Sequence, residues 1–215
     1  MEEWNARFDG ERFEKGELIA TFNGQARAVL TGERVALNFL QHLSGVATLT
    51  AAFCAELEGT QARIVDTRKT TPLLRKLERA AVVHGGGANH RYNLATGVLI
   101  KENHIAAAGG LTTAVHRARA AAPHLMKIEV EVRDLIEFDE ALHAGADVIL
   151  LDNMPIVDMA EAVRRAEGRN LVLEASGNMS LDRVRDVAET GVHLISVGAL
   201  THSPRAIDFS LLVKG

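Results

Sequence analysis

Short apolar runs alternate with longer amphipathic segments along most of the chain. Each run is bounded by a polar residue or a glycine, whereas the segments between the runs repeat their apolar positions with helical spacing. Strands that alternate with helices in this way predict a parallel β/α architecture. The predicted strands end at Asp66, Lys101, Glu131, Asp152, near Ser176 and at Gly198, and the predicted helices span residues 72–83, 111–121, 133–144, 155–166 and 181–190.

The residues at the strand ends favour a barrel. In a β/α barrel many strands contribute to the active site at their carboxyl ends, whereas a doubly wound sheet concentrates its site at one switch point. Nearly every predicted strand finishes in a polar residue or a glycine. We therefore expect an α/β protein with a parallel β/α barrel that is open or incomplete.

Local signals mark where the helices start and stop. A hydroxyl side chain that caps a helix or precedes a proline is typical of a start, and a glycine directly after a helix is typical of a left-handed stop. The starts are predicted at Thr71-Pro72, Ser180 and Ser203-Pro204, and the stops at Gly145, Gly168, Gly191 and the glycine run 85–87.

The first part of the chain has a different character. Residues 17–22 and 25–30 predict two short strands joined by the turn signal Asn23-Gly24. A lone hairpin is marginal in water, so we expect these strands to be the end of a domain whose beginning is missing or supplied elsewhere. Residues 33–57 follow with a helical stripe, which Gly45 interrupts weakly.

Composition excludes several classes of protein. The 215 residues include 24 Lys and Arg against 28 Asp and Glu, giving a net charge of −4, and only 4% are aromatic, which argues against nucleic acid as a partner. No apolar stretch is long enough for a membrane span, and the acidic N-terminus has no secretory signal. A single cysteine, Cys54, allows no internal disulfide and lies in an apolar helical stripe typical of core. We expect a cytoplasmic protein.

Two carboxylates share one strand face. Alternation along residues 128–132 puts Glu129 and Glu131 opposite three apolar side chains. Either this strand is a sheet edge with a solvated face, or the pair points into a polar barrel mouth and binds Mg²⁺ or a substrate hydroxyl. Asp152 and Asp66 also end apolar runs, and each could instead cap the helix that follows.

Basic residues gather at the predicted strand ends and loops. Arg68-Lys69, His90-Arg91 and Lys101 each have a simple interpretation as solvated loop charges. The predicted fold brings Arg68-Lys69 and Lys101 together, however, and a cationic pocket in a net-acidic chain implies a small anionic substrate.

Two glycine turns are candidates for binding phosphate. Ser176-Gly177-Asn178 leads into a predicted helix start, where free backbone N–H groups favour anions, and Val197-Gly198-Ala199 ends the next strand. Paired phosphate turns at the last two strands are typical of β/α barrels. The chain contains no metalloprotease, Walker, zinc-finger or serine-hydrolase motif.

Seven short motifs carry a resemblance to a known family. They are Asp66-Thr67-Arg68-Lys69-Thr70, His90-Arg91, and residues 99–104, 129–132, 151–154, 174–177 and 197–203. In this order and spacing they resemble quinolinate phosphoribosyltransferase, and residues 31–38 are similar to the start of that family's interdomain helix. The resemblance covers the chain from about residue 16.

The resemblance implies an activity and a set of roles. Family members convert quinolinate and phosphoribosyl pyrophosphate to nicotinate mononucleotide, CO₂ and pyrophosphate with Mg²⁺, in de novo NAD biosynthesis. Catalytic roles would belong to Lys69, Lys101, Glu131 and Asp152, of which Glu131 and Asp152 would face the ribose and the Mg²⁺, directly or through substrate or water. Substrate would be bound by these four residues together with Thr67, Arg68, His90, Arg91 and Arg34, the last donated across a homodimer or higher homo-oligomer; phosphate would be bound by Ser176, Gly177, Asn178, Val197, Gly198, Ala199 and His202.

The resemblance also divides the chain and leaves alternatives. Residues 1–32 would be the remnant of an N-terminal α/β sandwich domain that is several dozen residues longer in the family. Residues 33–60 would form an interdomain helix and residues 61–215 the catalytic barrel. The alternatives are a related phosphoribosyltransferase with another substrate, such as the molybdenum-associated relative, and a barrel that binds a phosphorylated ligand without turnover because its N-terminus is short.

Overall fold

Six parallel strands form a curved sheet in the computed structural model, which describes residues 3–214. Its strands are β3 (Arg63–Val65), β4 (Val98–Ile100), β5 (Ile128–Val132), β6 (Val148–Asp152), β7 (Val172–Ser176) and β8 (Leu194–Ser196), in the order β3-β8-β7-β6-β5-β4. Within the described residues no ladder joins β3 to β4, although Ala88 bridges β3 at its free edge. The sheet is therefore an open barrel of parallel β/α units, as the sequence predicts.

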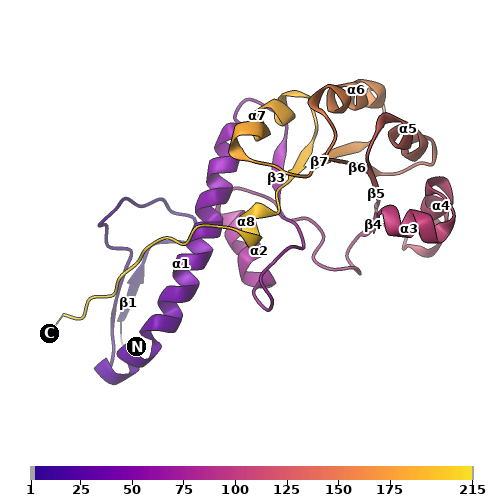
Figure 1. Ribbon diagram of the computed structural model, residues 1–215. Helices are drawn as coiled ribbons and strands as arrows, with labels where there is room; N and C mark the ends of the chain where they lie inside the picture. The colour runs from indigo at the N-terminus through magenta and orange to yellow at the C-terminus, as the bar shows by residue number, and fades with distance from the viewer. Residues whose placement is uncertain (1–2, 215) are drawn as a thin grey trace.

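Helices cover the outer, convex side of this sheet (Figure 1). Those predicted from the sequence are α2 (Arg75–His84), α4 (Leu111–Ala121), α5 (Leu135–His143), α6 (Ile156–Ala166) and α7 (Leu181–Glu189), and all five are confirmed with ends that shift by up to a few residues. The sequence did not predict α3 (Glu102–Ala108) and α8 (Ala199–His202), because one or two turns leave too short a periodic pattern.

Several predicted helix boundaries need correction. Helix α2 starts after Leu74 rather than at Pro72, and Ser203 ends α8 instead of starting a new helix. Ser180 does occupy the N-terminal cap of α7, but its side chain makes no capping hydrogen bond. The predicted left-handed stops are confirmed, since the φ angles of the three glycines are positive. These are 79° at Gly145, 75° at Gly168 and 92° at Gly191.

The predicted hairpin at the start of the chain is wrong in one strand. Strand β2 (Ala20–Asn23) pairs antiparallel with β1 (Glu3–Ala6), and residues 25–30 are not a strand at all. Gln25 caps α1 (Ala26–Glu56) instead, because the segment after it favours helix and β2 already has a partner upstream. The helix thus begins earlier than residue 33, while the proposed division into three domains stays a prediction.

Helix α1 runs unbroken through Gly45, where the sequence suggested an interruption. A Cβ atom at Gly45 would lie 2.3 Å from the carbonyl oxygen of Arg205. The backbone N–H of Ile207 donates to the carbonyl of Gln41 at 3.1 Å, so the C-terminal segment crosses α1 at this point (Figure 1). The glycine is therefore required for close contact between two segments far apart in sequence.

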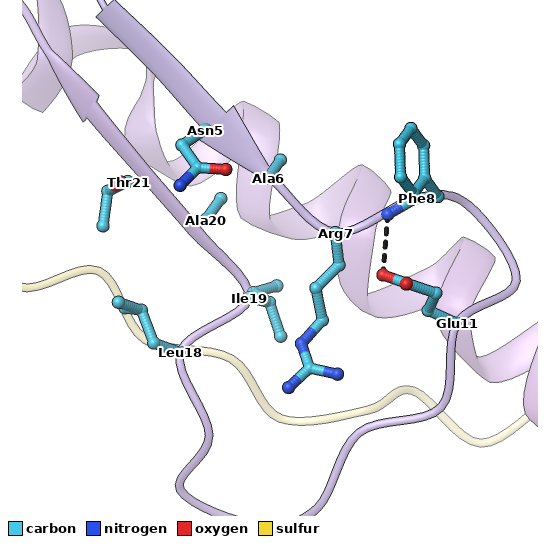
Figure 2. Close-up of a pocket in the computed structure, with 9 residues that line it drawn as sticks. All are labelled: Asn5, Ala6, Arg7, Phe8, Glu11, Leu18, Ile19, Ala20 and Thr21. Carbon is cyan, nitrogen blue, oxygen red and sulfur yellow. Dashed lines mark hydrogen bonds between the residues drawn. The ribbon is translucent and has the colours of Figure 1, made fainter.

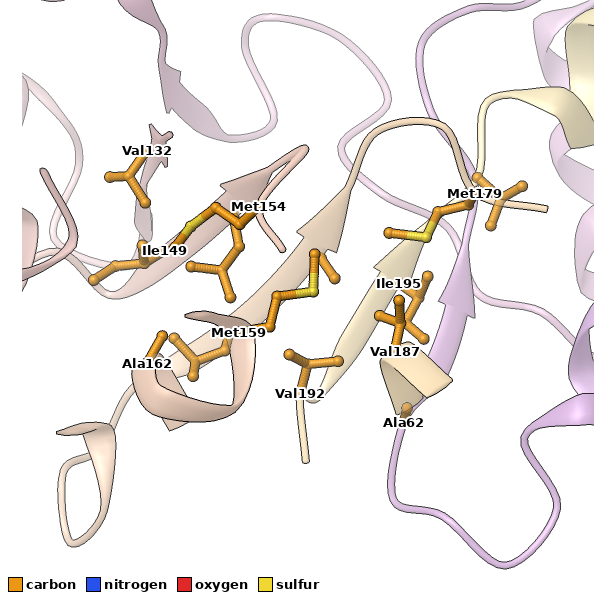
Figure 3. Close-up of a cluster of buried hydrophobic side chains, with 14 of the residues drawn as sticks. Ala62, Val132, Ile149, Met154, Met159, Ala162, Met179, Val187, Val192 and Ile195 are labelled. Atoms are coloured by element: carbon orange, nitrogen blue, oxygen red, sulfur yellow. The ribbon is translucent and has the colours of Figure 1, made fainter. Parts of the chain in front are cut away.

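The apolar core lies between the sheet and its outer helices. Figure 3 shows Met159 and Ala162 of α6 and Val187 of α7 packed against Ile149 and Ile195 of the strands. The predicted edge-strand alternative for residues 128–132 is wrong, because β5 lies between β4 and β6.

The concave side of the sheet is unusually polar. Glu131 of β5 is in register with Leu150 of β6, which is in turn in register with Glu174 of β7. Alternation places these side chains on the face opposite the apolar core. Carboxylates therefore line the inside of the barrel while hydrocarbon fills the space outside it.

Cys54 lies where the sequence predicts it. Cys54 is half-buried against the core, and burial raises the pKa of its thiol, as expected for an inert side chain. Among the described residues, no helix has both the length and the apolar character that crossing a bilayer requires.

Candidate active site

Apart from Arg34, the predicted site residues collect at one end of the barrel. Parallel strands direct their carboxyl ends to the same side of a sheet, and most candidates lie on or directly after a strand of this sheet. The candidates, strand by strand, are Asp66 and Thr67 to Lys69 after β3, Lys101 after β4, Glu131 on β5, Asp152 on β6, Ser176 to Asn178 from β7, and Val197 to Ala199 after β8.

A buried carboxylate organises the loop that carries His90 and Arg91. Asp66 accepts the backbone N–H of His90 at 2.7 Å and two contacts from Nη1 of Arg79 at 3.2 Å. The same guanidinium donates to the carbonyl oxygen of His90 at 2.8 Å. Burial raises the pKa of Asp66, and the hydrogen bond and the Arg79 charge oppose that rise. Asp66 thus holds the His90 loop instead of capping a helix.

His90 projects into the barrel between two acidic side chains. Its Nε2 atom lies 3.2 Å from Oε2 of Glu129 and 3.5 Å from Oε2 of Glu174. Its Nδ1 atom accepts the backbone N–H of Arg91 at 2.7 Å, so the ring proton belongs on Nε2. We call His90, Glu129 and Glu174 the buried trio; their ligand atoms lie within 4.8 Å of one another, close enough to bind a cation as well.

Burial perturbs the acid–base behaviour of the trio. Burial and then the charge of Glu129 raise the pKa of Glu174 to about 7. Burial disfavours the charged form of His90, but the hydrogen bond with Glu129 and the charge of Glu174 outweigh it and raise the pKa of His90. A site with such perturbed groups is a candidate functional centre.

Basic side chains lie after the carboxyl ends of β3 and β4 and in the loop that carries His90. Burial and the neighbouring charge of Arg68 lower the pKa of Arg91, so these two guanidinium groups are close enough to repel each other. Nη1 of Arg91 donates to the carbonyl of Gly97 at 3.0 Å, which fixes its direction. Lys101 forms an ion pair with Glu131 across the β4–β5 edge.

Lys69 is held beside the last strand. Its backbone N–H donates to Oγ1 of Thr67 at 3.1 Å, and its carbonyl accepts the hydroxyl of Thr201 at 2.8 Å. A Cβ atom on Gly198 would lie 3.2 Å from Cδ of Lys69 and 3.3 Å from the ring of His202. Glycine at this position lets Lys69 and His202 approach the same turn.

The turn after β7 is joined to the end of β6. Asn153 donates from its side chain to Asp152 at 3.1 Å and accepts from the side chain of Asn178 at 3.0 Å. Gly177 has a φ of 95°, and a Cβ atom there would lie 2.3 Å from the Asn153 amide. Asn153 therefore couples the carboxylate of Asp152 to the proposed phosphate turn.

Arg34 and one surface hollow lie away from this constellation, and a second hollow lies beside it. Arg34 is exposed on the part of α1 that projects beyond the barrel, so it does not join the other candidates within one chain (Figure 1). A hollow of about 330 Å³ lies between the ends of β1 and β2, bordered by Arg7, Leu18 and Ile19 (Figure 2), and it contains no predicted site residue. A second hollow, of about 420 Å³, is lined by Thr70, Arg75 and Tyr92 beside the Arg68 loop.

Glu174 and Arg79 are functional candidates that the sequence alone did not single out. A glutamate inside an apolar strand run is a usable signal for Glu174, since buried carboxylates are rare. Arg79 gives no comparable signal, because it is one of several charges along a helix.

Comparison with known proteins identifies the family. The family model described as "Quinolinate phosphoribosyl transferase, C-terminal domain" matches residues 46–212, and the model of the corresponding N-terminal domain matches residues 3–44. The chain belongs to this family. It is 47% identical over 203 residues to a probable carboxylating nicotinate-nucleotide pyrophosphorylase of Bacillus subtilis (strain 168), an alignment covering 94% of this chain and 70% of the relative.

Other relatives agree in sequence and in structure. A carboxylating nicotinate-nucleotide pyrophosphorylase of Mycobacterium leprae (strain TN) is 46% identical over 205 residues, with 94% of this chain and 72% of the relative covered. The crystal structure of NadC from Streptococcus pyogenes superposes with a TM-score of 0.92 at 43% identity, covering 97% of this chain and 74% of that one. This quinolinate phosphoribosyltransferase family member therefore has the fold of NadC.

Proposed function

We propose that this protein transfers a phosphoribosyl group from phosphoribosyl pyrophosphate to quinolinate, releasing pyrophosphate and CO₂ and forming nicotinate mononucleotide for NAD biosynthesis. It is a pentosyltransferase by this assignment. The observation that supports it is the neighbouring pair of cations Arg68 and Arg91, together with Lys101 at the carboxyl end of β4, in a chain of this family. Two ring carboxylates on a small substrate would find matching charges there.

The cations would orient the pyridine ring for attack. Arg68, Arg91 and Lys101 would bind the two carboxylates, and Lys69 would contact quinolinate or the phosphoribosyl donor. Both ring nitrogens of His90 already have protein partners, so direct contact with a carboxylate would require one of these hydrogen bonds to be exchanged. Holding the ring nitrogen near ribose carbon 1 makes the encounter intramolecular, an effect that can be large.

The carboxylates of Glu131 and Asp152 and the two glycine turns would bind the phosphoribosyl donor. The turns at residues 176–178 and 197–199 would bind phosphate, with His202 close by, and Thr67 would support the loop that carries Lys69. Glu131 and Asp152 would tolerate the positive charge that develops on the ribose as pyrophosphate leaves. Attack makes the ring nitrogen quaternary, and the adjacent carboxylate then leaves as CO₂. The electron pair of the broken bond stays on the ring carbon, which takes up a proton from solvent to give nicotinate mononucleotide.

The carboxylate oxygens of Asp152 and Glu131 would suit Mg²⁺. Asp152 is a half-exposed carboxylate that accepts a hydrogen bond from Asn153, and Glu131 is a second oxygen donor paired with Lys101. Hard oxygen ligands are those that Mg²⁺ prefers, and it commonly keeps water or substrate phosphate as well. When bound, the ion would neutralise charge on the departing pyrophosphate.

A homodimer would complete the site. Exposed apolar side chains on the first half of α1, among them Val35 and Phe39, flank Arg34. An apolar helix face beside a cation suits burial against a second copy, in which Arg34 would reach the partner's barrel. With one cysteine and no helix able to cross a membrane among the residues described, we expect the enzyme to act in the cytoplasm.

The decisive experiment measures product formation. Purified protein with quinolinate, phosphoribosyl pyrophosphate and Mg²⁺ is expected to form nicotinate mononucleotide and CO₂ in equal amounts. Arg91→Ala and Lys101→Ala should each lose at least about 100-fold in kcat/KM, since each removes a charge-assisted contact. Lys127→Ala, directly before β5 at the opposite end of the barrel, is the matched control and should keep full activity.

The same assay can reject the proposal. If Lys127→Ala and Lys101→Ala reduce turnover equally, the mouth of the barrel is not the site. If the wild-type protein gives neither turnover nor quinolinate binding, the substrate assignment is wrong.

A further inference from the structure

The buried trio is almost fully withdrawn from solvent. The side chain of Glu174 is 2% exposed, that of Glu129 is 9% exposed and that of His90 is 15% exposed. Each carboxylate presents Oε2 to Nε2 of His90, and neither Oε1 atom has a hydrogen-bond partner among the described residues. One imidazole N–H therefore serves two carboxylates, and two buried oxygens are left without a donor.

One additional proton on the two carboxylates would supply a missing hydrogen-bond donor. Two buried negative charges next to each other are costly, and an unpaired buried oxygen adds to the cost. A proton on Glu174 would remove one charge and provide an O–H donor to Glu129. The pKa of Glu174, raised to about 7 by burial and by the charge of Glu129, is consistent with partial occupancy by this proton at neutral pH.

The trio lies within electrostatic reach of the cationic pocket. Arg91 directly follows His90, and its backbone N–H donates to Nδ1 of His90 at 2.7 Å, so its charge lies close to both the trio and Arg68. A dicarboxylate bound at Arg91 and Arg68 would offset the positive charge that Arg91 exerts on the trio. It would also add two negative charges nearby, so the affinity of Glu174 for a proton would rise.

We infer that Glu174 takes up a proton when a pyridine dicarboxylate binds, so that the protein binds its anionic substrate together with H⁺. This inference rests on the proposed function. Glu174 is then a positioning residue: by becoming neutral it removes the repulsion between the barrel interior and the substrate. The proton comes from solvent and is released when the dianion leaves, and no bond other than the carboxyl O–H forms or breaks.

Arg91 is the neighbouring cation that acts on His90, and the other charged groups at this end of the barrel have partners of their own. Asp66 is paired with Arg79, and Lys101 with Glu131. On β8 the hydroxyl of Ser196 lowers the pKa of Glu174, an effect smaller than that of burial. Oε2 of Glu129 lies closer to Nε2 of His90 than Oε2 of Glu174 does, at 3.2 Å against 3.5 Å, so Glu174 is the less well paired carboxylate and the one whose protonation responds to the ligand.

Calorimetry tests the inference directly. Quinolinate is titrated into the purified protein without phosphoribosyl pyrophosphate at pH 7.5, in buffers with different heats of ionisation. Linkage between the ligand and the proton predicts uptake of roughly 0.5 to 1 H⁺ per quinolinate bound. Glu174→Gln is expected to bind with uptake near zero, and Glu167→Gln, an exposed control at the end of α6, should match the wild type.

The pH dependence gives a second, mutation-free readout. Because Glu174 is already protonated well below pH 7, quinolinate affinity should be flat there. Above pH 7 it should fall by up to about tenfold per pH unit, as uptake costs progressively more. A wild-type affinity that stays constant from pH 6.5 to 9 would overturn the inference, even if Glu174→Gln does not fold.

The outcomes separate this inference from the proposed function. Quinolinate binding without proton uptake overturns the inference and leaves the function intact. Absence of quinolinate binding overturns both. Purified wild-type protein that holds one equivalent of a divalent metal, lost in Glu174→Gln, would show that a cation and not a proton compensates the two carboxylates.

Discussion

At the scale of single residues, Asp66 shows how a buried charge can shape a site without touching substrate. Its carboxylate binds the backbone of His90 and the guanidinium of Arg79, and Arg79 binds the carbonyl of His90 in return. The loop that carries Arg91 is therefore held through both the backbone N–H and the backbone C=O group of His90. A precise direction for Arg91 depends on a residue that no substrate needs to contact.

Asp66→Asn should destabilise the protein and weaken substrate binding. The change leaves Arg79 without its charged partner, so we expect a loss of about 2–4 kcal/mol in the free energy of unfolding, measured in urea. The KM for quinolinate should rise more than kcat falls, because Arg91 is displaced. Asp208→Asn, an exposed aspartate, should change neither quantity, and an equal effect of both substitutions would refute the role of Asp66.

How far the site can be read from the sequence depends on the residue. Lys101 and Asp152 follow apolar runs, so strand periodicity alone places them at the carboxyl ends. The sequence marks Glu174 only as part of a motif, because its significance comes from Glu129 and His90, which are far away along the chain. Proximity of this kind is decided by strand order, and strand order is not encoded in local periodicity.

At the scale of elements, periodic segments were predicted well and isolated ones were not. Helix α4 has the predicted ends because its apolar face packs on the sheet. The segment after Gln25 was predicted as a strand because Asn23-Gly24 resembles a hairpin turn. This segment is a helix instead, because β2 already pairs with β1, which lies before it in the chain. A local turn signal cannot reveal that a strand already has its partner.

Helix α1 offers a test of element packing. Gly45→Ala should lower the free energy of unfolding by about 1–3 kcal/mol, because the new Cβ would overlap the carbonyl of Arg205. Gly32→Ala is the matched control in the same helix: nothing lies within 4 Å of its Cβ, so it should gain about 0.5–1 kcal/mol. Thermal or urea unfolding measures both. Stabilisation by both substitutions would show that the C-terminal segment does not pack on α1.

At the scale of the whole molecule, one chain does not bring all the predicted substrate-binding residues together. Arg34 is carried by the projecting half of α1, whereas Lys101 lies at the barrel mouth. A second copy of the chain would reconcile the two positions. The dimer would then be a condition for activity and not only for stability.

Mixing two inactive variants tests this arrangement. Arg34→Ala and Lys101→Ala should each be nearly inactive alone. After co-refolding in equal amounts, half of the dimers are mixed and each has one intact site, so activity should return to about one quarter of the wild-type value. Dimers of two copies of the same variant should regain no activity. A mixture that stays inactive despite subunit exchange, monitored by sedimentation, would place Arg34 in its own chain's site or outside any site.

The alternation along β5 has a consequence for how this protein can change over time. Ile128, Val130 and Val132 belong to the hydrocarbon layer, while Glu129 and Glu131 between them face the barrel interior. Neighbouring codons thus specify separate tasks, and a substitution at position 131, whose side chain is partly exposed, can alter chemistry without removing a side chain from the apolar core. Such a strand can explore new substrates one residue at a time, without first having to rebuild the scaffold that carries it.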